Sequence, residues 1–177
     1  MSKLVSPTAA LDAQATVRRH IADISQPAAA AAFSGHGFVI DSLGFLLPPQ
    51  LKCEVLERLQ PCPLPGTAAW LMGMVHVRGR IMPVFDLRRL LFPNESAQRP
   101  QRYLSIDPQQ KGLALALYSM PFRLDLQEHQ RLTRTAGIPE ILLPFCSNLF
   151  HHDRVWIELD YKAFFIQQSQ RLHNISE

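Results

Sequence analysis

Apolar residues along this chain come in short runs that turn residues separate. Leu71–Val77 is such a run and Ile81–Phe85 follows it closely, and short apolar runs bounded by turn residues predict β-strands. Gly79-Arg80 lies between the two runs and places glycine at the first central position, where a type II′ turn requires it. We therefore expect a β-hairpin. Because Pro83 has no N–H to donate, its strand is expected at an edge or with that position turned away from its neighbour.

Asp86 follows this hairpin directly and predicts a short helix, because an aspartate side chain accepts hydrogen bonds from the free N–H groups of a first helical turn. The apolar residues of the helix share one face: Leu87, Leu90 and Leu91. Arg88 and Arg89 are expected to face water. Pro93 ends the helix, because proline cannot continue it.

The same arrangement recurs near the end of the chain. Asp160 is followed by apolar residues at the same spacing as Asp86, namely one, four, five and six places later. A second predicted hairpin, made of Ile141–Phe150 and Arg154–Leu159, precedes it. The sequence therefore contains a half-repeat in which a hairpin, an aspartate cap and a short helix occur twice.

The rest of the chain from residue 33 onward also favours short strands. The further runs that predict strands are Gly37–Ile40, Leu43–Leu47, Arg102–Ile106, Gly112–Tyr118 and Phe122–Leu126. In Leu51–Leu59 the apolar residues fit both helical and alternating spacing, so a helical turn leading into a strand stays open there. Gln127–Glu140 is expected to be a polar loop. With 14 prolines and 8 glycines to make turns, the chain is predicted to be all-β.

The first part of the chain differs from this pattern. Ser6–Ser25 carries an imperfect apolar stripe at helical spacing and predicts a helix, and the alanine-rich Gln26–Ala32 ends it. We expect an N-terminal helix and linker over 1–32, a globular domain over 33–170 and a tail over 171–177. The helix is either a frayed appendage or an element that docks on the domain or on a partner.

The first hairpin and its helix share a spaced set of residues: Gly73, Val75, Val77, Arg78, Gly79, Ile81, Pro83, Val84, Asp86 and Leu87. Upstream, Phe45-Leu46-Leu47-Pro48 and Glu54-Val55 form a second set. Both sets resemble the pattern of CheW-like domains, the adaptor modules of bacterial chemotaxis-type signalling. The resemblance implies two small five-stranded SH3-like β-barrels packed together, with short helices in addition to the N-terminal helix.

The resemblance also implies a function. It is that of a non-catalytic signalling adaptor that couples the cytoplasmic hairpin tip of a methyl-accepting chemoreceptor to the regulatory domain of a CheA-like histidine kinase. The residues that match the family's partner-binding positions are Leu47, Glu54, Val55, Val77, Arg78 and Gly79. Such a protein is cytoplasmic and is recruited to membrane-associated receptor arrays by its partners. The preceding helix and the start at Gly35-His36-Gly37-Phe38 are more similar to twitching-motility (type IV pilus) adaptors than to flagellar CheW.

Two departures from the family pattern qualify this expectation. Lys52 stands where the family usually has valine, so either the groove for a receptor is less apolar or Leu51 supplies the apolar contact. Tyr118-Ser119 replaces a Val-Asp pair near the end of a middle strand. These departures keep open a degenerate CheW-like scaffold that has lost receptor binding and binds another protein.

Charge and hydropathy leave one further alternative. The formal net charge is +3, but the basic residues are spread along the chain, whereas nucleic-acid-binding proteins usually concentrate them on one patch. A basic nucleic-acid-binding β-barrel is therefore the less favoured alternative, and nucleic acid is not an expected partner. No apolar run approaches the length that spans a membrane, so direct membrane insertion is not expected.

Candidate catalytic chemistry is sparse. Cys53, Cys62 and Cys146 lack the spacing of a zinc site. His151-His152-Asp153 is the best metal candidate, but neighbouring strand residues point to opposite faces, which favours a polar hairpin tip. His76 lies in mid-strand, which favours a structural role over that of a catalytic base. We expect no catalytic residues, no metal site and no cofactor, and hence no enzyme.

Overall fold

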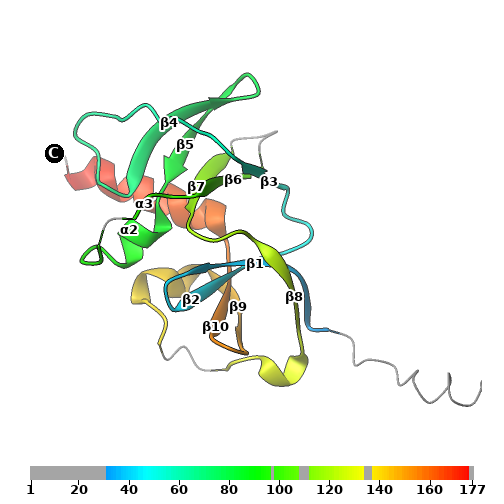
Figure 1. The fold of residues 1–177 in the computed structure, drawn as a ribbon. Coiled ribbons are helices and arrows are strands. Elements are labelled where there is room, and N and C mark those ends of the chain that lie inside the picture. Colours follow the sequence, from blue (N-terminus) through cyan, green and yellow to red (C-terminus); the bar gives the residue numbers. More distant parts are fainter. Residues whose placement is uncertain (1–30, 97, 108–111, 134–136, 176–177) are drawn as a thin grey trace, which may run out of the picture. The chain divides into compact units, whose positions relative to one another are not determined.

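The computed structural model describes residues 31–96, 98–107, 112–133 and 137–175, and the predicted N-terminal helix lies outside these ranges. The described residues form ten strands in two five-stranded sheets, with short helices between them, so the predicted all-β fold is confirmed. The first sheet, in the lower part of Figure 1, contains β1 (Phe33–Ile40), β2 (Leu43–Leu47), β8 (Phe122–Leu126), β9 (Cys146–His151) and β10 (Val155–Leu159). The second, in the upper part, contains β3 (Cys53–Leu56), β4 (Leu71–Val77), β5 (Arg80–Phe85), β6 (Arg102–Ile106) and β7 (Leu113–Leu117).

Each sheet takes strands from both halves of the chain. The strand orders are β8-β1-β2-β10-β9 and β3-β6-β7-β5-β4. In the first sheet the β1–β2 hairpin pairs antiparallel with β8 and parallel with β10. In the second, the β6–β7 hairpin pairs antiparallel with β3 and parallel with β5. The two sheets thus repeat one pattern. The strand that follows the β1–β2 hairpin of the first sheet, β3, belongs to the second sheet, and the strand that follows the β6–β7 hairpin of the second sheet, β8, belongs to the first.

The middle strands β2 and β7 are buried at every residue. Their leucine and phenylalanine residues at alternate positions belong to one core shared by the two sheets: Leu43, Phe45, Leu47, Leu113, Leu115 and Leu117. The residues between them face the interior of their own sheet, where Leu46 joins one cluster and Ala114 and Ala116 join another. A strand covered on both faces has a continuous apolar sequence, which is what these two strands show.

Trp156 of β10 fills the interior of the first sheet and is fully buried. Its ring lies over two glycines: a Cβ atom would lie 2.3 Å from this ring at Gly44 and 2.5 Å from it at Gly37. Phe122 of β8 meets the same ring edge-to-face, with a centroid distance of 5.7 Å. One side chain therefore connects β10 with β2, β1 and β8, and the two glycines provide the space that it needs.

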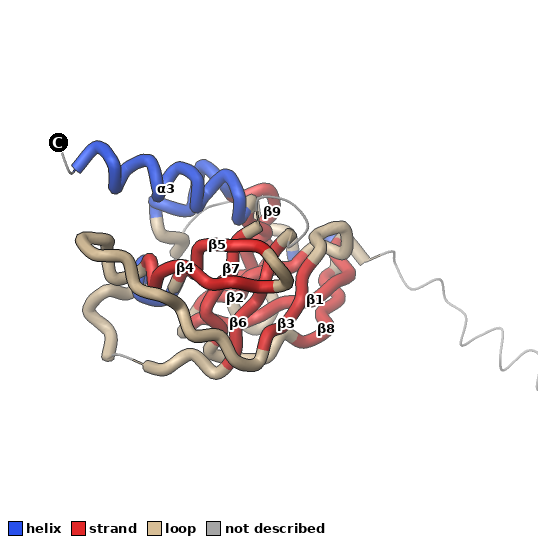
Figure 2. The backbone as a smooth tube through the Cα atoms, turned by 90° about the horizontal axis from the view of Figure 1, so that it is seen from above, coloured by secondary structure: helices blue, strands red, loops and turns tan. Residues whose placement is uncertain are grey.

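The helix α3 (Tyr161–Ile175) follows β10 and runs along one side of the strands (Figure 2). Its Tyr161 hydroxyl donates a hydrogen bond of 2.8 Å to the Leu46 carbonyl in β2, and its Phe165 ring stacks on Phe85 of β5 at 4.3 Å. The helix thus packs on both sheets. It continues through residues expected to form a tail, as far as Ile175.

Both aspartate caps are present in the structure. Asp86 Oδ1 accepts a hydrogen bond of 3.1 Å from the Arg89 N–H in α2 (Leu87–Leu91), and Asp160 Oδ1 accepts one of 2.9 Å from Ala163 in α3. One expectation for α2 is wrong, however. Arg88 does not face water but is only 4% exposed, because Asp41 of the β1–β2 turn lies over that side of the short helix.

The turn between β4 and β5 differs from the predicted type II′ turn. Val77 pairs with Arg80, so the two central residues are Arg78 and Gly79, with φ of 48° and 80°. Two positive φ angles make this a type I′ turn, whose twist matches that of the flanking strands. The predicted turn is therefore wrong by one residue, and the left-handed conformation falls on Arg78 as well as on glycine.

Two other segments differ from the sequence-based expectations, and a third, left open by the sequence, forms a strand. The predicted strand Ile141–Phe150 is wrong in its first part: 3-10 helix η2 (Glu140–Phe145) contains Pro144, which has no N–H for a strand ladder, and β9 begins only at Cys146. The predicted loop before it contains a 3-10 turn, η1 (Glu128–Gln130). The ambiguous segment after β2 forms the strand β3.

Candidate functional site

A cavity of about 350 Å³ lies where β1, the end of β2, β3, β6 and the β7–β8 connection come together. Its lining is largely apolar and consists of His36, Leu47, Pro48, Pro49, Leu51, Cys53, Val55, Leu104, Met120 and Pro121. Two of the predicted partner-binding residues, Leu47 and Val55, belong to it. A largely apolar concave site with a few polar groups is the usual form of a binding pocket in a protein.

The geometry around β3 answers the question raised by Lys52. Leu51, Cys53 and Val55 line the cavity, whereas Lys52 is exposed to solvent and does not line it. Alternate residues of an extended segment face opposite sides, which places Lys52 on the side of Glu54. Leu51, and not Lys52, is therefore an apolar residue of this segment at the cavity.

Glu54 and Arg78 form an ion pair on the other side of β3. Arg78 Nη2 lies 2.5 Å from Glu54 Oε1, and the side chains are 73% and 31% exposed. Glu54 lies on β3 and Arg78 follows β4, and these strands are the two edges of the second sheet. Farther along, Cys62 and Met74 exchange backbone hydrogen bonds of 2.7 and 2.9 Å. The Glu54–Arg78 pair joins the two edges directly, and the Cys62–Met74 bridge joins β4 to the segment after β3, as expected where a sheet curls into a barrel.

The predicted partner-binding residues thus fall into three places. Leu47 and Val55 line the cavity. Arg78 and the exposed Gly79 form the tip of the β4–β5 hairpin, and Glu54 lies on β3 and contacts Arg78 through the ion pair. Val77 is 7% exposed and packs in the interior of the second sheet, so its side chain is turned away from solvent.

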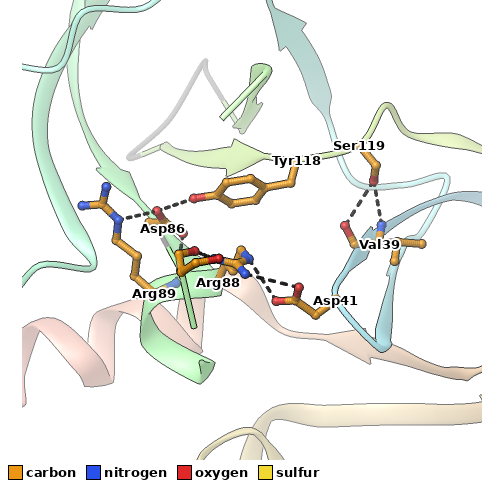
Figure 3. A network of polar contacts seen from close by, with 8 residues as sticks. Val39, Asp41, Asp86, Arg88, Arg89, Tyr118 and Ser119 are labelled. Carbon is orange, nitrogen blue, oxygen red and sulfur yellow. Dashed lines mark hydrogen bonds and ion pairs between the residues drawn. The ribbon is translucent and has the colours of Figure 1, made fainter. Parts of the chain in front are cut away.

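A polar junction that the sequence analysis did not identify joins the two sheets (Figure 3). The Tyr118 hydroxyl donates a hydrogen bond of 2.6 Å to Oδ2 of the fully buried Asp86, and Arg89 Nε lies 3.1 Å from the same oxygen. Beside them Arg88 Nε lies 3.0 Å from Asp41 Oδ2, and its guanidinium lies over the Tyr118 ring. The junction therefore links the β1–β2 turn of the first sheet with α2 and β7 of the second.

Ser119 continues this junction. Its hydroxyl donates to the Val39 carbonyl and accepts from the Val39 N–H, both at 3.1 Å. The Ser119 side chain thus forms the two hydrogen bonds with the Val39 backbone that a neighbouring strand would otherwise form. The substitution of Tyr118-Ser119 for the Val-Asp pair of the resembled family was the signal in the sequence, because both residues form contacts that the usual pair cannot form in this way.

The tyrosines have raised pKa values. Burial, followed by the hydrogen bond to Asp86, raises the pKa of Tyr118 above its ordinary range. Burial also raises the pKa of Tyr103, with the Asp86 charge as the next cause, and raises that of Tyr161. These are the 3 tyrosines of the chain. The folded protein therefore holds its phenolic protons more tightly than the unfolded chain does.

This difference predicts the alkaline behaviour of the protein. Below a pH of about 10 the phenols are neutral in both states and stability does not change through them; above it the unfolded chain loses protons that the folded state keeps, so stability falls. We expect phenolate absorbance to stay flat on raising the pH and then to rise in one steep step together with unfolding, whereas the chain in urea titrates gradually. Gradual phenolate formation in the folded protein would contradict these shifts.

The polar hairpin tip between β9 and β10 has contacts of its own. Asp153 accepts a hydrogen bond of 2.9 Å from the Trp156 indole N–H, and His152 Nδ1 lies 2.7 Å from the side-chain nitrogen of Gln130. Within the described ranges, no group of three or more His, Cys, Asp or Glu side chains is placed to hold a metal ion. Among the described residues, no helix is long and apolar enough to cross a membrane.

Comparison with known proteins gives a consistent result. The sequence pattern of the CheW-like domain matches residues 37–168. Protein PilI of Pseudomonas aeruginosa is 29% identical over 136 residues, which cover 75% of this chain and 75% of that protein. The crystal structure of the scaffolding protein TtCheW from Thermoanaerobacter tengcongensis superposes with a TM-score of 0.60 at 16% identity, over 75% of this chain and 92% of that one. At this identity the likeness concerns the fold, and it agrees with the expected pair of barrels.

Proposed function

The chain belongs to the CheW-like domain family, and on this premise we propose that it is a non-catalytic signalling adaptor. In this proposal it couples the cytoplasmic hairpin tip of a methyl-accepting chemoreceptor to the regulatory domain of a CheA-like histidine kinase. It acts in the cytoplasm and is recruited to receptor arrays through these partners. The similarity to PilI favours a twitching-motility system over a flagellar one.

The observation that carries the proposal is the apolar cavity beside β3. Leu47, Leu51 and Val55 line it together with three prolines, and such a groove suits the apolar face of a helix. The Glu54–Arg78 ion pair lies on the opposite side of the same strand. A receptor helix in the cavity and a kinase domain at the hairpin would be held in a fixed relation by one short strand.

Arg78 provides the sharpest test. The full-length protein would be mixed with a soluble signalling fragment of a chemoreceptor and with the kinase regulatory domain, and the affinity for each would be measured. Arg78→Ala is expected to weaken at least one complex about tenfold or more, because arginine is one of the few residue types that most often dominate the affinity of an interface. Its effect on the free energy of unfolding is expected to stay below about 1 kcal/mol, since the pair is exposed.

Arg80→Ala is the matched control. Arg80 is the neighbouring exposed arginine of the same turn, so its removal changes the net charge equally while leaving the Glu54–Arg78 pair intact. Equal loss of binding in both variants would indicate general electrostatic attraction instead of a role for Arg78. Binding of the kinase domain without the receptor fragment would select the degenerate scaffold. Binding of nucleic acid with a steep salt dependence, and of neither protein, would overturn the adaptor proposal.

A further inference from the structure

We propose that Tyr118 and Ser119 are positioning residues that hold the Met120–Pro121 wall of the cavity in the shape that a receptor helix recognises. This inference rests on the proposed function of the cavity and adds a determinant of its affinity. It concerns the β7–β8 connection, the only part of the cavity lining that lies after β6 among the described residues.

The Met120–Pro121 wall forms where the hydrogen-bond ladder between β1 and β8 ends. β8 pairs with β1 from Leu126–Phe33 as far as Phe122–Gly37. The residue directly before β8 is Pro121, which has no N–H and cannot extend the ladder. The chain therefore leaves the sheet at this point, and Met120 and Pro121 turn to the cavity.

Two anchors fix the wall on its other side. Tyr118 is tied to the second sheet through its 2.6 Å hydrogen bond to Asp86. Ser119 is tied to the first sheet through its two hydrogen bonds of 3.1 Å to Val39. The connection is thus held to both sheets immediately before the wall begins (Figure 3).

The wall ends in apolar surface that remains open. Met120 is 53% exposed and Phe122 is 44% exposed, and they are among the five large apolar side chains exposed in the described structure. Both are neighbours of Pro121 in the sequence, but only Met120 lines the cavity, since the Phe122 ring packs edge-to-face on Trp156. A rigid wall that presents open apolar side chains binds without first having to be ordered, which raises affinity because the cost of ordering is already met in the free protein.

Tyr118→Phe removes only the hydroxyl that reaches Asp86, and it tests the inference. We expect the affinity for the soluble receptor fragment to fall about fivefold or more, because binding then draws on a smaller population of correctly shaped protein. In the free variant, hydrogen exchange at Met120 and Phe122 should quicken while that of β10 stays unchanged. Tyr103→Phe removes the same group from a buried tyrosine outside the cavity and should leave affinity unaltered. Ser119→Ala should act like Tyr118→Phe, and Ser119→Thr, which keeps a hydroxyl, should not.

A double-mutant cycle separates positioning from general loosening. If Tyr118 acts through the wall, Tyr118→Phe should weaken binding by less than about twofold in a Met120→Ala background, because the contact that it positions is already gone. Full additivity of the two losses, or an unchanged affinity in Tyr118→Phe, would overturn the inference while leaving the proposed function intact. Failure of the unmodified protein to bind the receptor fragment would instead reject the proposed function, and the role of the wall with it.

Discussion

Asp86→Ala is expected to lower the free energy of unfolding by about 3 kcal/mol. The substitution removes the cap of α2 and also leaves the Tyr118 hydroxyl and the Arg89 guanidinium without the buried carboxylate that they contact. Loss of a helix cap alone costs about 1 kcal/mol. The remainder comes from the half-buried Tyr118 hydroxyl and the partly exposed Arg89 guanidinium, which both lose a fully buried charged partner. Urea unfolding followed by the fluorescence of the two tryptophans, Trp70 and Trp156, measures the difference.

Asp160→Ala is the control that the half-repeat supplies. Asp160 caps α3 with the same geometry, but it is exposed, so its loss should cost only the cap, about 1 kcal/mol. Equal effects at the two positions would show that the junction around Asp86 adds nothing to stability. A Tyr118→Phe variant should recover part of the Asp86→Ala loss, because it removes the hydroxyl that was left unpaired.

Gly44→Ala is also expected to lower the free energy of unfolding by about 3 kcal/mol, but because it overfills the core. Its Cβ would lie 2.3 Å from the Trp156 ring, and that ring is fully buried, so that it can move only by displacing its neighbours. Gly66→Ala is the comparison: nothing lies within 4 Å of a Cβ at Gly66, whose φ is +73°, so only the backbone strain of about 1 kcal/mol applies. Thermal or urea unfolding of both variants gives the two values.

The smaller ring of phenylalanine should relieve the clash. Trp156→Phe destabilises the protein by itself, because it leaves a space in the interior of the first sheet. In that background, Gly44→Ala should cost less than about 1 kcal/mol, which gives a clear coupling energy between two residues in contact. Additive losses would mean that the Gly44 position is sensitive for a reason other than the ring.

The parts of this fold that could be predicted are those that depend on residues close together in the sequence. An aspartate followed by apolar residues at helical spacing is enough to predict a capped helix, and both caps lie where the half-repeat places them. The parallel pairing of β2 with β10 could not be predicted in this way, because it joins residues such as Leu43 and Val155 that share no local signal. The same reason explains Arg88, which three leucines place on the outer face of α2 and which Asp41 of a distant turn then covers.

The candidate site was partly predictable. Leu47 and Val55 came from the resemblance to a family, and both line the cavity. Met120 and Pro121 were missed because they lie in a connection whose position depends on where the β1–β8 ladder stops. Pro121 directly before an alternating strand was the available signal, since it marks the residue at which such a ladder must end.

The exchange of strands between the sheets has a consequence for synthesis on the ribosome. When the chain has emerged only as far as α2, the β1–β2 hairpin lacks both of its neighbours, β8 and β10, and β3 lacks β6. Neither barrel can then close, and the apolar faces of both remain open to other molecules. The second sheet has all five of its strands only when β7 has been made, and the first sheet has all of its strands only after the last hairpin, β9–β10. Since contacts between distant residues form slowly, the second barrel is expected to close before the first, which has to wait for the end of the domain.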